Sequence, residues 1–197
     1  LIVKYTASAS RKPRCWWCGE DPLYCAYHDK EWGVAVHDDR KMFEMLILEG
    51  FQAGLSWITI LRKRENFRKA FKNFEARKVA RFGKTDVARL MNDAGIIRNR
   101  LKIEGAVTNA RCFLEVQKEF GSFDRYIWGF TGNRTLRNPK GVTRKTMKPT
   151  SLESDALSKD LKRRGFKFVG PTVCHAHMQA TGMVDDHVVG CFKYRKR

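Results

Sequence analysis

The sequence contains no long hydrophobic run, which restricts the classes of protein that it can encode. No stretch approaches the roughly 18 consecutive apolar residues of a transmembrane helix. Residues 1–14 are basic and carry no acid, but they lack the apolar core of a secretory signal. We therefore expect no membrane association, a disordered basic extension over 1–14, and a single domain over 15–197.

The sequence also lacks several catalytic patterns. It has no Gly-rich phosphate-binding loop, no GxSxG motif and no HExxH motif. It shows neither a sustained alternation of apolar and polar residues nor an internal repeat. Because the chain instead consists of helical patterns separated by short breaks, the predicted fold class is all-α.

Acidic side chains are scarce relative to basic ones. The chain has 39 Lys and Arg against 21 Asp and Glu, which gives a formal net charge of 39 − 21 = +18. Such an excess favours a polyanionic partner, because bound Lys and Arg release counterions from a phosphate backbone. The basic residues lie in segments that also look folded, so we expect a charged face on a globular body. The alternative is a charge that only aids solubility.

Caps and breaks predict where the helices begin and end. Asp38 or Asp39 can cap a helix that runs to about residue 53, and Ser56 can cap the next one. The stretch 98–119 has apolar residues at helical spacing and ends before Gly121. Shorter helices are predicted near 75–82, over 86–92 after Thr85, after Ser122, from Ser154 to Gly165, and from Pro171 to Gly182. Residues 131–150 predict a long connection.

One acidic residue, Glu49, lies inside a long apolar stretch. On a helical wheel, Glu49 falls between Met45 and Leu46 on the apolar face. Glu44 falls on the opposite side. A carboxylate on an apolar face is costly unless it is paired, hydrogen-bonded or directed into a cavity. The alternative is a glutamate at a fraying helix end that bends out to solvent, since Gly50 follows.

Aromatic side chains with polar tips gather in residues 15–33. The segment contains Trp16, Trp17, Tyr24, Tyr27 and Trp32, which are half of all Trp and Tyr in the chain. Such rings suit a pocket that stacks a flat ligand, and nucleic-acid bases are flat. The alternative is a packed N-terminal cap.

Six cysteines show no spacing typical of a disulfide framework, so we interpret them as reduced thiols or metal ligands. One possible zinc set would join the two ends of the chain: Cys15, His28, His187 and Cys191. By spacing alone other ligands remain open, because Cys18 forms a CxxC pair with Cys15, and His175 and His177 are close in sequence.

Residues 90–103 predict a helix–hairpin–helix, in which a Gly-containing break with two isoleucines separates two helices. Tight hairpins and helix N-termini present backbone N–H groups to phosphate. Arg98, Arg100 and Lys102 follow, as a device that binds a nucleic-acid backbone would require. The alternative is an ordinary corner between two helices.

Five segments together resemble a known family. They are "DPLYCAYHDKEWG", "LEGFQAGLSWITILRKRENFRKAF", "DAGIIRNRLKI", "SDALSKDLKRRGFKFVGPT" and "DHVVGC", and with their spacing they span Cys15 to about Tyr194. They are similar to the Tag-type 3-methyladenine DNA glycosylase I family of the helix–hairpin–helix superfamily. The resemblance implies a monofunctional hydrolase that removes 3-methyladenine from alkylated double-stranded DNA and so initiates base-excision repair.

The same resemblance implies one structural Zn²⁺ per chain and a monomer that works wherever the DNA lies. That place would be the cytoplasm (nucleoid) of a bacterium, or the nucleus or an organelle of a eukaryote. The termini would be joined by the zinc site, whose implied ligands are Cys15, His28, His187 and Cys191. Because all four ligands come from the protein, the site would be structural and would not activate water.

Roles for the remaining site residues follow from the resemblance position by position. Glu49 would be the catalytic, base-binding glutamate. The base-binding pocket would comprise Trp17, Tyr24, Tyr27, Trp32 and Trp57. The DNA-binding residues would be Gly54 and Leu55, which fill the space left by the flipped nucleotide, and the hairpin residues Ala94, Gly95, Ile96, Ile97 and Arg98.

The chain departs from the family pattern at residues 175–177. Family members often have an aromatic–Ser–aromatic stretch where this chain has His175, Ala176 and His177. If this segment borders the pocket, we expect a different base selectivity or pH response. Cys18, Cys25 and Trp16 are also unusual.

A second departure concerns an aspartate. Most superfamily relatives place a catalytic aspartate after the hairpin, but no aspartate lies between Asp93 and Asp124. Its absence is tolerable because N3 methylation makes the base cationic and weakens its bond to the sugar. Narrow specificity follows, since normal purines have stronger bonds. Two rival interpretations are a non-enzymatic nucleic-acid-binding domain and a zinc-stapled RNA-binding protein.

Overall fold

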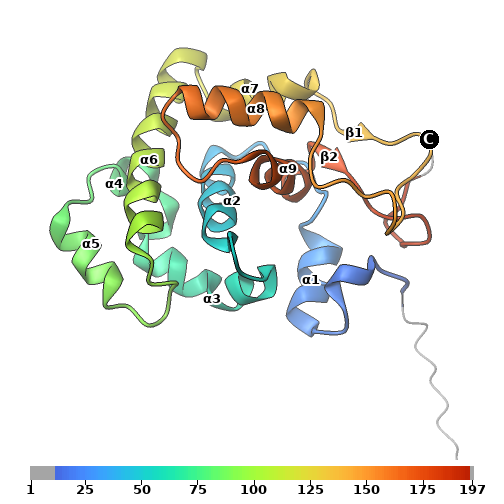
Figure 1. Cartoon of the computed structure of the whole chain (residues 1–197), viewed down its shortest axis with the longest axis horizontal. Helices are drawn as coiled ribbons and strands as arrows, with labels where there is room; N and C mark the ends of the chain where they lie inside the picture. The colour runs from blue at the N-terminus through green and yellow to red at the C-terminus, as the bar shows by residue number, and fades with distance from the viewer. Residues whose placement is uncertain (1–11, 196–197) are drawn as a thin grey trace, which may run out of the picture.

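The computed structural model describes residues 12–195, most of which lie in helices (Figure 1). Nine α-helices occur in this part of the chain: α1 (Pro22–Lys30), α2 (Asp39–Gln52), α3 (Trp57–Ala70), α4 (Ala76–Val79), α5 (Lys84–Met91), α6 (Arg100–Phe120), α7 (Phe123–Trp128), α8 (Leu152–Arg163) and α9 (Pro171–Ala180). Single 3-10 turns lie at Trp16–Cys18, Lys72–Phe74 and Gly129–Thr131. The helical fold class predicted from the sequence is confirmed at this level. Of the extension predicted over 1–14, residues 1–11 lie outside the described residues.

Helix α2 runs through the middle of the molecule, and α3, α6, α7 and α9 pack around it (Figure 1). As predicted, Asp38 caps it, because the carboxylate accepts a hydrogen bond of 2.8 Å from the N–H of Lys41. Residues 42–51 are all buried. The helical wheel places Glu44 opposite the apolar face, but α2 has no exposed side over these residues. Glu44 is buried and forms an ion pair of 2.6 Å with Arg64.

The predicted helix–hairpin–helix is present as α5, the hairpin at 92–99, and α6. Helix α6 begins after Asn99, whose side chain accepts a hydrogen bond of 3.1 Å from the N–H of Lys102. It ends at Gly121, which adopts the left-handed conformation at φ 85° that glycine favours. Helix α5 begins two residues earlier than predicted, at Lys84 instead of residue 86. Gly83 takes the N-cap position instead of Thr85, and Asp86 accepts a hydrogen bond from its N–H.

The C-terminal part differs from the sequence-based prediction in two places. Ser151 caps α8, and Ser154 lies one turn further on, where its hydroxyl oxygen accepts a hydrogen bond of 2.8 Å from the Ser151 N–H. The 131–150 connection contains β1 (Leu136–Arg137), which pairs in parallel with β2 (Val184–Asp185). Strands of two residues are too short to produce a visible alternation, so the all-α prediction missed this pair.

The two ends of the described chain meet beside α1. The N–H of Phe192 donates a hydrogen bond of 2.8 Å to the carbonyl of Pro13. The Lys193 ammonium donates to the carbonyls of His28 at 3.3 Å and Trp32 at 3.1 Å. The C-terminal segment is thus fixed against the N-terminal aromatic segment. None of the described helices is long and apolar enough to span a membrane.

Candidate active site

A cavity of about 240 Å³ lies among α1, α2, α3 and α9. Its lining comes from segments far apart in sequence: Trp16, Trp17, Tyr24, Tyr27, Trp32, Glu49, Gln52, Trp57, Met147, Ala176, Gln179 and Ala180. All five residues predicted for a base pocket are among them, and so is Glu49. The fold therefore brings the aromatic segment and the buried glutamate into one site.

The aromatic side chains form the walls of this cavity, with Trp17 at their centre. Its ring centroid lies 5.1 Å from that of Tyr24 and 4.9 Å from that of Trp32. Tyr27 lies 5.5 Å from Trp57, between centroids, at a tilt of 51°. Burial raises the pKa of Tyr24 to about 12 and that of Tyr27 well above 10. Both phenols are therefore neutral at physiological pH and suited to stacking and hydrogen-bond donation.

Glu49 lines the cavity and is 3% exposed. One carboxylate oxygen, Oε2, lies 2.9 Å from Nδ1 of His177. The other oxygen, Oε1, has no hydrogen-bond partner among the described residues, and neither has the indole N–H of Trp57. Burial raises the pKa of the Glu49 carboxyl, and the nearby His177 opposes this increase. An unpaired acceptor and an unpaired donor thus line one aromatic cavity, as a ligand with a polar edge would require.

A candidate metal centre lies next to this cavity. The ligand atoms of Cys15, His28 and Cys191 all lie within 4.8 Å of one another, and Sγ of Cys191 is 3.4 Å from Nε2 of His28. The imidazole of His187 has its centroid 5.2 Å from that of His28. Its Nε2 is buried without a partner among the described residues. Cysteine and histidine in this combination are zinc ligands, so the three clustered residues could bind a metal ion.

Carboxylates fix the orientation of both histidines. Nδ1 of His28 lies 2.8 Å from Asp29, and Nδ1 of His187 lies 2.7 Å from Asp185. Such pairs leave Nε2 available, as in metal-binding histidines that donate their other N–H to a carboxylate. Gly33 permits this arrangement. It has φ +72°, and a Cβ at this position would come within 2.6 Å of the His187 ring.

The histidines of the candidate metal centre also contact the aromatic walls. The ring of Trp17 lies 5.3 Å from that of His28, and the ring of Trp32 lies 4.6 Å from that of His187. A change at the cluster would therefore move side chains that line the cavity.

The loop after α2 presents an apolar side chain to solvent. Gly54 has φ +82°, a conformation that other residues rarely adopt, and Leu55 beside it is 41% exposed. Lys102 fixes the start of this loop, because its ammonium donates hydrogen bonds to the carbonyls of Phe51 at 2.8 Å and Ala53 at 2.6 Å. The interpretation of Lys102 as a backbone-binding residue was therefore wrong: its side chain is buried against the end of α2.

Replacing Lys102 by Met is expected to destabilise the protein and loosen the 53–56 loop. The two carbonyls at the end of α2 would lose a buried donor, at a cost of about 1–3 kcal/mol. Thermal unfolding should show a loss of roughly 5 °C. Lys118→Met is the matched control, since Lys118 lies on the same helix and is exposed. Equal melting temperatures for both variants would contradict this role.

The hairpin lies at the same end of the molecule as α3. Its Ile96 is buried and Ile97 packs against the core, whereas Ala94 and Arg98 are exposed. The Lys63 ammonium on α3 donates to the carbonyl of Ala94 at 3.0 Å, so that a cation lies directly behind the hairpin.

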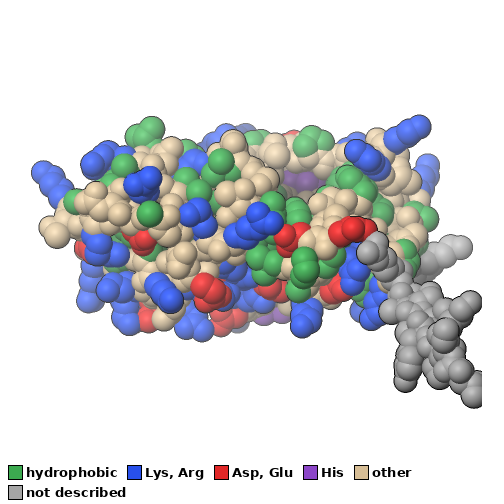
Figure 2. All heavy atoms as spheres, turned by 90° about the horizontal axis from the view of Figure 1, so that it is seen from below, with side chains coloured by type: hydrophobic (Ala, Val, Ile, Leu, Met, Phe, Trp, Pro, Cys, Tyr) green, Lys and Arg blue, Asp and Glu red, His purple; other side chains and the backbone are tan. Residues whose placement is uncertain are grey.

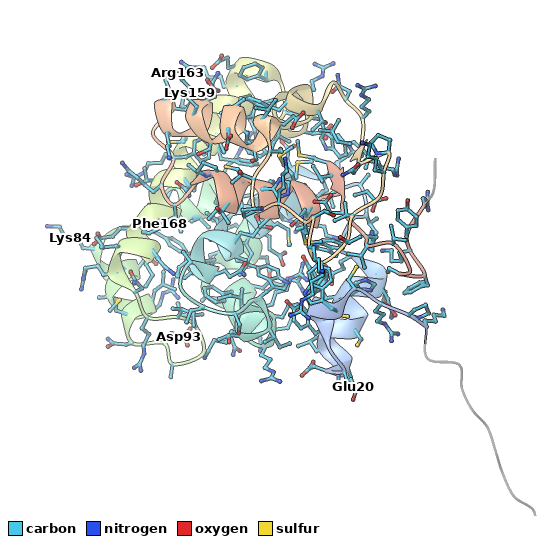
Figure 3. The ribbon with its side chains drawn as sticks, turned by 45° about the vertical axis from the view of Figure 1, so that its right-hand side comes forward. Glu20, Lys84, Asp93, Lys159, Arg163 and Phe168 are labelled. Carbon is cyan, nitrogen blue, oxygen red and sulfur yellow. The ribbon has the colours of Figure 1, made fainter. Side chains whose placement is uncertain are left out.

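Basic side chains extend over this end of the molecule. Figure 2 shows Lys and Arg scattered across the face seen from below, with hydrophobic side chains gathered toward its right half. Figure 3 places Asp93 of the hairpin and Glu20 before α1 at this end, and Lys159 and Arg163 of α8 at the opposite end. The hairpin and α1 therefore border one common face.

Comparisons with known proteins identify the family of this chain. The model of the methyladenine glycosylase family matches residues 17–194. This chain belongs to the methyladenine glycosylase family. It is 51% identical to DNA-3-methyladenine glycosylase 1 of Escherichia coli (strain K12) over 181 residues, covering 92% of this chain and 96% of the relative.

Two solved structures of 3-methyladenine DNA glycosylase I superpose on this methyladenine glycosylase with a TM-score of 0.89 each. One is 47% identical and covers 92% of this chain and 100% of its own. The other is 34% identical, covers 93% and 98%, and was solved in complex with 3-methyladenine. The family predicted from sequence motifs is confirmed.

Several site residues of this family member escaped the sequence-based prediction. Gln52, Met147 and Gln179 line the cavity although no motif singled them out. The sequence offered His177 as a competing metal ligand and as a departure from the family pattern, and nothing in it placed His177 against Glu49. A partial signal existed, because His177 lies on the predicted helix from Pro171, and a histidine among apolar neighbours needs a partner.

Proposed function

We propose that the protein is a DNA-3-methyladenine glycosylase, which hydrolyses the N-glycosidic bond of 3-methyladenine in alkylated double-stranded DNA. The observation that carries the proposal is the cavity itself: a buried carboxylate with one unpaired oxygen, enclosed by aromatic rings. A flat cationic base suits this site, because the rings stack on its faces and Glu49 accepts a hydrogen bond at its edge. Family membership supports the same substrate.

The target base must leave the duplex before it can enter the cavity. Leu55, exposed on a short loop fixed by Lys102, is the side chain that fills the space left by the flipped nucleotide. The hairpin from Ala94 to Arg98 binds the phosphate backbone, supported by the Lys63 ammonium behind it. The basic charge of the chain adds affinity that decreases with salt.

The chemistry needs little assistance from the protein. The alkylated base is already cationic, so when the bond between C1′ and the ring nitrogen breaks, the base departs as a neutral molecule. Water then attacks C1′ and loses its proton to solvent. This route is consistent with the absence of an aspartate between Asp93 and Asp124. We infer a monofunctional enzyme that acts as a monomer and does not cleave the strand.

The metal centre would hold one structural Zn²⁺ with His187 as fourth ligand beside Cys15, His28 and Cys191. Two features support this fit: the buried, unpartnered Nε2 of His187 and the carboxylates behind both histidines. Four protein ligands leave no position for water, so the metal would brace the fold and take no part in hydrolysis.

The proposed function is tested by release of free base from methylated duplex DNA, measured by chromatography. We expect 3-methyladenine to be released and unmodified purines to remain. Abasic sites should accumulate with strands intact until alkali is added. Tight binding of methylated duplex without release would instead favour a non-enzymatic DNA-binding domain, and preference for RNA in competition would favour an RNA-binding protein.

A further inference from the structure

His177 lies behind the base-binding carboxylate and does not line the cavity. It comes from α9 and is fully buried, and its Nδ1 lies 2.9 Å from Oε2 of Glu49 on α2, 128 residues away in sequence. Its other nitrogen, Nε2, has no partner among the described residues. A titratable ring is therefore in contact with Glu49, the one carboxylate among the described residues that line the cavity.

We propose that His177 is a positioning residue: it orients Glu49 and shares a proton with it, and so sets the pH range in which the cavity accepts a cationic base. The inference rests on the proposed glycosylase function. His177 acts through Glu49, because the cavity contains no atom of its ring.

The contact determines which carboxylate oxygen faces the ligand. With Oε2 in contact with Nδ1 of His177, Oε1 is left as the acceptor toward the cavity. A buried carboxylate without such a donor would rotate or take up a proton, because desolvation penalises its charged form. The hydrogen bond thus orients the Glu49 carboxylate and favours its ionised form.

The surroundings isolate this pair from other titrating groups. Tyr27 from α1 and Cys174 from α9 face it, and burial raises the pKa of each, that of Cys174 to about 12. Both therefore remain protonated at neutral pH. From α8, Lys162 acts on Cys174 rather than on the pair.

The other histidine of α9 belongs to a different contact. Nε2 of His175 lies 3.3 Å from Asp186, which follows β2. Asp186 also accepts a hydrogen bond of 2.8 Å from Gln179. His175 thus serves as a matched control: a second buried histidine, two residues away, that does not contact Glu49.

The pair has two relevant charge states. When the shared proton has been released, the Glu49–His177 pair carries one net negative charge, which attracts a cationic base. With that proton bound, the pair has no net charge and the attraction is lost. Activity should therefore rise with pH through the titration of the pair, as coupled sites titrate together.

The test compares base release from methylated duplex DNA by the wild type, His177→Asn and His177→Phe between about pH 5 and 8, after subtraction of release without enzyme. Asn places a donor where Nδ1 was, so it keeps the hydrogen bond but cannot titrate. Phe removes both. His175→Asn is the control, and melting curves confirm that each variant is folded.

The acid limb of His177→Asn should lie on the order of one pH unit below that of the wild type, because the second proton site is gone. It should also lie below that of His177→Phe, whose Glu49 lacks its donor. On the alkaline plateau, His177→Asn should retain kcat/KM within a few-fold, whereas His177→Phe should lose on the order of 10-fold. The acid limb of His175→Asn should match that of the wild type.

Coincident acid limbs for the wild type and His177→Asn, or an equal shift in His175→Asn, would overturn the proposal. A wild type that releases no base at any pH refutes the glycosylase function instead. In that case, nitrogen NMR of the histidine rings still tests the contact between His177 and Glu49. The nitrogen resonances of the His177 ring should differ between Glu49→Gln and the wild type, and unchanged resonances refute the contact.

Discussion

Glu49→Gln is expected to release 3-methyladenine on the order of 100-fold more slowly than the wild type. A hydrogen bond to a charged group contributes about 1.5–3 kcal/mol, and glutamine offers the same shape without the charge. The loss should appear in kcat/KM for methylated DNA. Binding of unmodified duplex should be unchanged, because in the proposed function the hairpin and the basic side chains make that contact.

The stability of the variant should distinguish a lost function from a lost fold. Burial raises the pKa of the Glu49 carboxyl, so the folded state favours the protonated form. Its contribution to stability is present at low pH and is lost as pH rises through the folded-state pKa. Ionised Glu49 therefore costs stability at neutral pH. Glu49→Gln should melt at or above the temperature of the wild type.

Glu44→Gln is the matched control, because Glu44 is the other buried glutamate of α2. It forms an ion pair with Arg64 and lies outside the cavity. Removing one member of a buried pair costs about 3–5 kcal/mol, so this variant should be less stable and yet hydrolyse normally while folded. If Glu44→Gln lost base release and Glu49→Gln retained it, the assignment of the site would be reversed.

The walls of the site could be predicted because each residue carried its own local or family signal. Trp17, Tyr24 and Tyr27 cluster within one short segment, and two of them share one face of α1 at a spacing of three residues. Glu49 broke an apolar pattern. The hairpin followed from a Gly-containing break between two periodic stretches.

The supporting contacts could not be predicted, because they depend on how distant helices pack. Lys102 looks like any basic residue near a hairpin, and only the placement of α6 against α2 turns it toward the carbonyls of Phe51 and Ala53. Likewise, a helical wheel assumes one exposed side, and α2 has none along most of its length. The partners of Glu44 and His177, which are Arg64 and Glu49, could not be predicted from spacing in the sequence.

Loss of the metal is also expected to have a large effect, and the main effect should be a lower stability of the fold. Cys15 and Cys191 lie near opposite ends of the chain, so a metal bound to both would close a loop of nearly the whole domain. Such cross-links contribute about 3–5 kcal/mol by restricting the unfolded chain. Cys191→Ser, or treatment with a strong chelator, should lower the melting temperature by roughly 10 °C.

Cys112→Ser is the control, since Cys112 lies half-buried on α6 and is not part of the cluster. Metal analysis should give about one zinc per wild-type chain, an unchanged content in Cys112→Ser, and a strongly reduced one in Cys191→Ser. A metal-free wild type with the same melting temperature as the metal-loaded protein would refute a structural zinc.

Activity should fall with the metal even below the melting transition, although no step of hydrolysis uses it. The rings of Trp17 and Trp32 lie within 5.3 Å and 4.6 Å of the two histidines. Released histidines would let these walls of the cavity shift, and catalysis depends on geometry at this scale. The loss should therefore appear at temperatures where circular dichroism still reports native helix. Loss of a structural metal should therefore raise the KM for methylated DNA, because the cavity walls shift. Glu49→Gln, in contrast, changes one side chain of the site and leaves the walls in place.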